Sequence, residues 1–190
     1  MTVRTSSARR ERTRERARRD ILESAFQVFA RRGYAAATLA ELAEAAGYAA
    51  PSLYRYFGSK EEIFQRLLAS VSAEVQETFD EPVDRSLPLP ARLSGLFRAL
   101  DRLAEGRREF FDLLLAQADA GQRLAHFEAL LEAWLRKNAG RGELRVPPAL
   151  AARVAAGILL ALNHGRGRTG TTPGEMARIA ADLVLHGVST

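Results

Sequence analysis

Apolar residues recur three and four positions apart along most of the chain, which is the spacing of one face of an α-helix. Arg31 and Arg32 suit the negative end of a helix dipole, and Gly33 can adopt the left-handed conformation that ends a helix. The pattern therefore predicts an amphipathic helix of roughly four turns that stops at Gly33. Its apolar face consists of Ile21, Leu22, Ala25, Phe26, Val28 and Phe29.

Two short helices are predicted next, with a tight turn between them. Thr38 and Glu41 have the spacing of a capping box, so the second helix is expected to open at Thr38 and to end at Gly47. Pro51 suits the first turn of a third helix, expected to run to Phe57, because the first N–H groups of a helix have no partner within it. Two short helices joined by a glycine-containing turn and braced by a preceding helix predict a helix-turn-helix.

The rest of the chain also has helical period. Ser59 can cap a long fourth helix, whose apolar ladder repeats every four residues. We find no strand pattern of any length, so we predict an all-α fold of about nine helices. The ladder is Ile63, Leu67, Val71, Val75 and Phe79, and further helices are expected over 93–103, 109–118, 122–137, 149–163 and 175–185.

Positive charge is concentrated at the N-terminus. Residues 1–19 hold eight arginines against two glutamates, a net charge of +6, whereas the whole chain carries +5. We predict a basic, disordered arm over residues 1–14 that meets a polyanion, and a solvated tail is the alternative reading.

Composition excludes several classes of function. The absence of cysteine rules out disulfides and every cysteine-based zinc motif. No apolar run is long enough for a transmembrane helix, and no apolar stretch of a secretory signal follows the N-terminal arginines, so we expect a cytoplasmic protein with no membrane partner. His126, His164 and His186 are scattered without acidic neighbours at zinc spacing, and we expect no metal, no cofactor and no enzymatic activity.

The predicted helix-turn-helix supplies candidate contacts to double-stranded DNA. Hydroxyl and amino groups at its edges suit phosphate oxygens, while Arg55 suits guanine and small alanine side chains suit thymine methyl groups. Core packing for Tyr54 and a solvated position for Lys60 are the alternatives. The predicted DNA-binding set is Thr38, Tyr48, Ala49, Ala50, Ser52, Tyr54, Arg55, Tyr56 and Lys60.

The run TLAELAEAAGYAAPSLYRYF (38–57), followed by GSKEEIF (58–64), resembles the tetracycline-repressor (TetR) family. The similarity covers about residues 15–75, and the segment 180–187 weakly resembles the closing helix of such proteins. The resemblance implies a homodimer with a DNA-binding domain over 15–75. It also implies a regulatory and dimerisation domain over 76–190, whose ligand pocket controls release from a palindromic operator.

Two positions depart from the family pattern. Tyr48 and Ala49 stand where Val and Ser are usual. Losing the serine cap costs on the order of 1 kcal/mol, which we expect Pro51 to offset in part. Tyr48 is expected either to repack the turn or to reach the DNA backbone.

The C-terminal half offers a candidate pocket and a candidate interface. Aromatic side chains there are expected in a bundle core, but they are also apolar enough to line a site for a small, largely apolar ligand. A smooth stripe on the last two helices predicts a dimer interface, although a helix buried within the monomer gives the same pattern. The pocket set is Phe97, Phe111, Gln117, His126, Phe127, Trp134 and Asn163, and the interface set is Leu150, Val154, Ile158, Leu162, Ile179 and Leu183.

Together these features predict a sequence-specific DNA-binding transcriptional regulator, a repressor that a small molecule releases from its operator. One alternative is a DNA-organising protein of the same fold that answers to no ligand. The other is a helical small-molecule carrier, against which the capping box and the SLYRYF run (52–57) argue.

Overall fold

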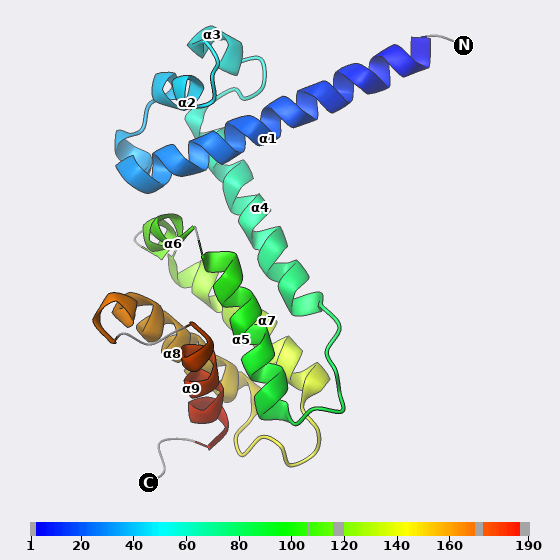
Figure 1. The fold of residues 1–190 in the computed structure, drawn as a ribbon, viewed down its shortest axis with the longest axis vertical. Helices are drawn as coiled ribbons and strands as arrows, with labels where there is room; N and C mark the ends of the chain where they lie inside the picture. Colours follow the sequence, from blue (N-terminus) through cyan, green and yellow to red (C-terminus); the bar gives the residue numbers. More distant parts are fainter. Residues whose placement is uncertain (1–2, 106, 116–119, 170–172, 187–190) are drawn as a thin grey trace. The chain divides into compact units, whose positions relative to one another are not determined.

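The computed structural model describes residues 3–105, 107–115, 120–169 and 173–186, and within them all regular secondary structure is α-helical (Figure 1). The prediction of an all-α fold of about nine helices is confirmed for this part of the chain. The helices are α1 (Val3–Ala36), α2 (Leu39–Ala45), α3 (Ala50–Leu53), α4 (Lys60–Asp80), α5 (Leu89–Ala104), α6 (Arg108–Leu115), α7 (Ala120–Asn138), α8 (Pro148–Thr169) and α9 (Pro173–His186).

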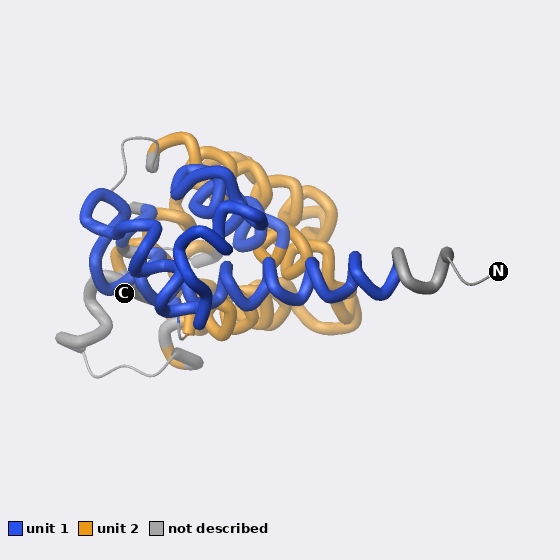
Figure 2. Tube along the Cα trace, turned by 90° about the horizontal axis from the view of Figure 1, so that it is seen from above, with its two compact units in different colours: residues 1–73, 107–116 blue, residues 74–106, 117–190 orange. Residues whose placement is uncertain are grey.

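The chain divides into two compact units (Figure 2). Unit 1 comprises Met1–Ala73 and Arg107–Ala116, and unit 2 comprises Glu74–Gly106 and Gln117–Thr190. The first boundary lies close to the expected division after residue 75. The second unit is not continuous in sequence, however, because α6 belongs to unit 1.

Helix α1 begins at Val3, where the sequence predicts a disordered arm over residues 1–14. Arginine and glutamate are strong helix formers, so a chain rich in both extends a helix once the rest of it is anchored by packing. An ion pair of 3.2 Å between Arg18 and Glu15, three residues apart, supports the turn of helix that follows this stretch. At the other end Gly33 has a φ of 75° and interrupts the helix where it is expected to stop.

Aromatic rings fill the core of unit 1. Phe26 of α1 packs against Phe110 of α6 with ring centroids 4.9 Å apart, and Phe29 meets Phe64 of α4 edge-on at 5.4 Å. Both Phe29 and Phe110 are fully buried. Large buried rings stabilise a small core strongly, and here they hold α1 as the brace behind α2 and α3.

In unit 2, α5 packs along α9 and α7 packs along α8. Helix α8 extends to Thr169, six residues beyond its predicted end at Asn163. Gly165 and Gly167 lie in this extension, and each lowers helix propensity by about 1 kcal/mol without ending the helix. Among the described residues no helix has the length and apolarity that crossing a membrane requires. The fully buried large side chains of this core are Leu89, Leu93, Phe97, Leu131 and Leu135.

Candidate nucleic-acid interface

The helix-turn-helix begins with a complete capping box. The backbone N–H of Glu41 donates to the Thr38 hydroxyl oxygen (3.2 Å), and the backbone N–H of Thr38 donates to the Glu41 carboxylate (2.9 Å). Two N–H groups that a helix start leaves without helical partners are therefore satisfied. The capping box predicted from the sequence is confirmed, with α2 itself running from Leu39 to Ala45.

The turn after α2 is closed by backbone hydrogen bonds. The N–H of Gly47 donates to the Glu44 carbonyl (3.0 Å), and the N–H of Tyr48 donates to the Ala43 carbonyl (2.8 Å). This pair of bonds is the Schellman motif, in which the residue after the cap takes a left-handed conformation. Gly47 does so with a φ of 74°, so a residue with a Cβ would be strained at this position.

Helix α3 is a single turn, Ala50–Leu53, rather than a helix to Phe57. Its N-cap residue Ala49 makes no side-chain hydrogen bond, so the stabilisation that a serine cap would give this helix is absent, as expected. The chain then continues as turns to Phe57, whose N–H donates to the Leu53 carbonyl at 3.0 Å. Leu53 and Phe57 are buried, while Tyr54 between them is 58% exposed.

The predicted DNA-binding residues differ in exposure. The structure brings all of them into unit 1, on or beside the α2–α3 pair. Thr38, Ala49, Tyr54 and Arg55 are exposed, and the other five are half-buried: Tyr48, Ala50, Ser52, Tyr56 and Lys60.

The ring of Tyr48 packs against that of Tyr56, with centroids 5.6 Å apart and planes at 59°. Of the two roles expected for Tyr48, repacking of the turn is therefore the one with a contact in the structure. A tyrosine in place of the usual valine supplies the extra apolar surface that this contact needs.

Two predicted phosphate ligands have intramolecular partners in the structure. The Lys60 ammonium donates to the backbone carbonyls of Tyr34 (2.8 Å), Ala35 (3.4 Å) and Ala37 (2.8 Å). The Thr38 hydroxyl, besides accepting in the capping box, donates to the Glu41 carboxylate at 3.0 Å. Each of the three ammonium hydrogens of Lys60 can therefore meet a carbonyl within the chain, and a phosphate contact by Lys60 stays a prediction.

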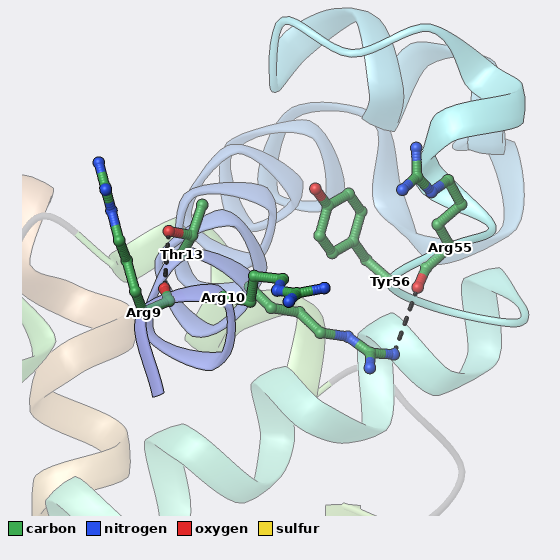
Figure 3. A pocket seen from close by; sticks show the side chains of 6 residues that line it. Arg9, Arg10, Thr13, Arg55 and Tyr56 are labelled. Atoms are coloured by element: carbon green, nitrogen blue, oxygen red, sulfur yellow. Dashed lines mark hydrogen bonds between the residues drawn. The ribbon is translucent and has the colours of Figure 1, made fainter. Parts of the chain in front are cut away.

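Sequence reasoning missed a basic hollow that the start of α1 forms with the end of the helix-turn-helix (Figure 3). It encloses about 530 Å³. The Arg14 guanidinium donates to the Arg55 carbonyl at 3.4 Å across it. The spacing of the arginines would have revealed one shared face if the helix had been expected to start this early. The lining residues are Arg9, Arg10, Thr13, Arg14, Arg55 and Tyr56.

The predicted ligand-pocket residues are only partly gathered. Phe97 and Trp134 are buried in the core of unit 2, and Phe127 packs against the same core. His126 is exposed, and Phe111 is half-buried in α6, which belongs to unit 1. Gln117 and the side chain of Asn163 lie outside the described residues.

The predicted interface residues include three exposed large apolar side chains. Leu150 is 48% exposed, Val154 43% and Ile179 37%. Ile158 is half-buried against the core of unit 2, and Leu183 is half-buried too. The side chain of Leu162 lies outside the described residues.

Unit 1 holds a helix-turn-helix with a capped first helix, a Schellman turn and an exposed Tyr54–Arg55 pair, and it continues into a second helical unit. The protein is therefore of the helix-turn-helix class with a helical C-terminal domain. The family of bacterial regulatory proteins named tetR matches residues 21–67. The TetR-family transcriptional regulator PfmR from Thermus thermophilus has 30% sequence identity to this chain. Its crystal structure matches the fold with a TM-score of 0.68, and the match covers 90% of this chain and 99% of that chain. The chain belongs to the TetR family.

Curated relatives match between about half and three fifths of the chain. The transcriptional repressor KstR2 of Mycobacterium tuberculosis is 34% identical over 108 residues, 57% of this chain and 52% of that protein. The transcriptional activator FasR of Mycolicibacterium smegmatis is 31% identical over 103 residues, 52% of this chain and 47% of that protein. The chain spans about half the length of the curated relatives it matches.

Proposed function

We propose that this protein is a DNA-binding transcriptional regulator of the cytoplasm that reads its operator through α2, the turn and α3. The observation that carries the proposal is the exposure of Tyr54 and Arg55 between two buried anchors, Leu53 and Phe57. Because the anchors fix the backbone on either side, the polar side chains are held outward at a defined position. Such a fixed display of polar groups is what reading a DNA groove requires.

Each exposed group has a chemical role in this proposal. Arg55 donates to the O6 and N7 atoms of a guanine, and Ala49 and Ala50 contact thymine methyl groups. Tyr54, Tyr56 and Ser52 donate to phosphate oxygens, which position the protein without selecting sequence. Thr38 and Lys60 act through the backbone that they hold, and Tyr48 supports Tyr56.

The test is selection of bound fragments from a pool of genomic DNA, followed by affinity measurement on the enriched sequence. Arg55→Ala is expected to weaken binding by about 1–3 kcal/mol and to relax the preference at one base pair. Arg31→Ala, an exposed arginine at the far end of α1, is the matched control and should leave that preference intact. Recovery of no sequence above the random background, with Arg55→Ala binding as tightly as the wild type, would contradict the proposal.

We further propose a homodimer formed through α8 and α9. Leu150 and Val154 stand one helical turn apart on α8, and Ile179 adds to them from α9, which packs on α8. Exposed apolar side chains of this size on one pair of helices favour burial against a second copy. Val154→Glu should give monomers by sedimentation velocity, whereas Ala133→Glu, at an exposed position of α7, should leave the dimer. A wild-type monomer at micromolar concentration contradicts the interface.

A small, largely apolar ligand is proposed to bind unit 2 and to release the operator, which makes the protein a repressor. The support is the apolar and aromatic character of this unit, where Phe97, Phe127 and Trp134 share one core. We expect ligand and DNA to oppose each other by a coupling of about 1–3 kcal/mol. Thermal-shift screening followed by DNA titration measures that coupling. Occupancy of hundreds of chromosomal sites with no responsive ligand would instead indicate a DNA-organising protein.

A further inference from the structure

The basic hollow of unit 1 gathers charges of one sign. Four of its six lining residues are arginines, and the other two, Thr13 and Tyr56, carry hydroxyl groups. Every lining side chain can therefore donate a hydrogen bond. A surface of clustered guanidinium groups is an attractive site for an anion, because positive potentials add where charges of one sign converge.

The register of α1 determines which of its charges reach the hollow. Arg9, Arg10, Thr13 and Arg14 recur at one- and four-residue steps and so share one face of the helix. Glu11 and Glu15 fall on a different face, and Glu15 is engaged by Arg18 at 3.2 Å. The helix thus places its acidic residues on a face that does not line the hollow. A disordered arm would not keep the two kinds of charge apart in this way.

The hollow is tied to the helix-turn-helix by a direct bond. Arg14 donates to the carbonyl of Arg55, the residue that we propose as the guanine reader. In Figure 3 the Arg10 side chain extends from α1 toward Tyr56, while Arg9 lies at the far edge. Since the backbone that carries these groups is already folded, no backbone conformational entropy has to be lost when an anion binds them.

We propose that this hollow is a binding site for the sugar–phosphate backbone of DNA, outside the base pairs that α3 reads. The inference rests on the proposed DNA-binding function and extends it, because it assigns the start of α1 a defined contact in place of a diffuse attraction. Phosphate oxygens are the ligands that converging guanidinium and hydroxyl donors suit best. The contact is sequence-independent and adds to the salt dependence of every duplex that the protein binds.

The test compares two double variants that remove the same charge from the same helix. Arg10→Ala with Arg14→Ala removes two of the four arginines that line the hollow, and Arg12→Ala with Arg19→Ala removes two exposed arginines from the opposite face of α1. Binding to a labelled duplex of mixed sequence is followed by fluorescence anisotropy at salt concentrations from about 50 to 200 mM. The hollow variant should lower the slope of log affinity against log salt by about two, and the control by less than one.

Two further measurements distinguish a DNA site from a folding defect and from a site for free phosphate. Arg10→Lys with Arg14→Lys keeps the charge and should retain most of the slope. That result would show that the lower slope of the alanine variant comes from lost charge and not from a folding defect. Inorganic phosphate at constant ionic strength should leave the melting temperature of the wild type and of the hollow variant equally unchanged. A phosphate-specific stabilisation of the wild type alone, with no difference in DNA slope, would mean that the hollow holds a free phosphate and would overturn the inference.

The remaining outcomes are also decisive. Equal slopes for the wild type and the hollow variant, or equal losses in the two alanine variants, overturn the hollow as a site and leave the proposed function standing. No binding of the wild type to any duplex at the lowest salt overturns both. Because the chain has no cysteine, Thr13→Cys offers a unique thiol for an iron chelate, which should cleave DNA beside the operator when the site is occupied.

Discussion

The ammonium nitrogen of Lys60 lies 2.8 Å from the carbonyl oxygen of Tyr34 and 4.6 Å from the centroid of its ring. The same nitrogen is 2.8 Å from the Ala37 carbonyl. The first residue of α4 thereby satisfies carbonyl groups that the end of α1 leaves without helical partners. Lys60 thereby helps to join the two helices on either side of the helix-turn-helix.

Replacing Lys60 with Met should therefore destabilise unit 1. The change removes a charged donor from half-buried carbonyls, and hydrogen bonds to charged groups contribute about 1.5–3 kcal/mol each. Urea unfolding should show a loss of about that size, while Arg66→Met, at an exposed position of the same helix, should change stability by less than about 0.5 kcal/mol. Unchanged stability together with a salt slope lowered by one would instead identify Lys60 as a phosphate ligand.

Tyr34 also donates its hydroxyl to the Glu61 carboxylate. That hydrogen bond, together with burial and the negative charge of Glu61, raises the pKa of Tyr34 to about 12. Because the folded-state pKa lies above the ordinary value of 10.0, the contribution to stability is complete below pH 10 and is lost as the pH rises toward 12.

Spectrophotometric titration should show a tyrosine ionisation step near pH 12. Tyr34→Phe should remove that late step and flatten the fall in stability with rising pH. Tyr54→Phe, at an exposed hydroxyl, is the control and should leave the late step in place. If the wild type shows no tyrosine ionisation near pH 12, the bond to Glu61 does not persist in solution.

The capping box at Thr38 gives a third prediction. Thr38→Ala removes the acceptor for the Glu41 N–H and should lower the free energy of unfolding by about 1 kcal/mol, within the range of about 0.5–2 kcal/mol measured for such caps. Thr38→Ser keeps the hydroxyl and should stay near the wild type. Equal losses in both variants would point to the Thr38 methyl group rather than to the cap.

The sequence was informative wherever local chemistry decides the backbone. Thr38 and Glu41 identify the start of α2, and Gly47 identifies its end, because a capping box and a left-handed glycine act within a few residues. The exposed Tyr54 between Leu53 and Phe57 follows from the same local pattern.

Local chemistry was less informative where tertiary packing decides. Helix α3 stops after Leu53 although the sequence favours a longer helix. Membership of α6 in unit 1 depends on Phe110 reaching Phe26, a contact between residues far apart in sequence. The helical start of α1 depends on anchoring further along the helix, since a short charged segment alone forms little helix in water. Lys60 has a partner in the Tyr34 carbonyl that a sequence pattern does not reveal.

A carboxylate in unit 2 connects a loop to the start of α5. Glu143, in the loop after α7, accepts hydrogen bonds from the backbone N–H of Gly140 (2.6 Å) and of Leu89 (3.2 Å). Both of its oxygens also accept from the Arg92 guanidinium, at 2.9 and 2.8 Å. Arg92 is itself buried and donates to the Asn138 carbonyl. A buried guanidinium requires such partners, because leaving it unpaired is strongly unfavourable.

Glu143→Gln should make the stability of unit 2 less sensitive to acid. The Gly140 N–H, assisted by Arg92 and the Leu89 N–H, holds the pKa of Glu143 below its ordinary value of 4.5. A folded-state pKa below the unfolded one gives stability that is complete above about pH 5 and is lost as the pH falls through the folded value.

Trp134, the one tryptophan and a buried residue of this unit, reports unfolding by its fluorescence. The variant should be less stable than the wild type at neutral pH, and the difference should shrink in acid. Glu132→Gln, which breaks an exposed ion pair with Arg136, should leave the wild-type acid profile nearly intact. A variant that loses stability in acid as steeply as the wild type would show that Glu143 does not control this transition.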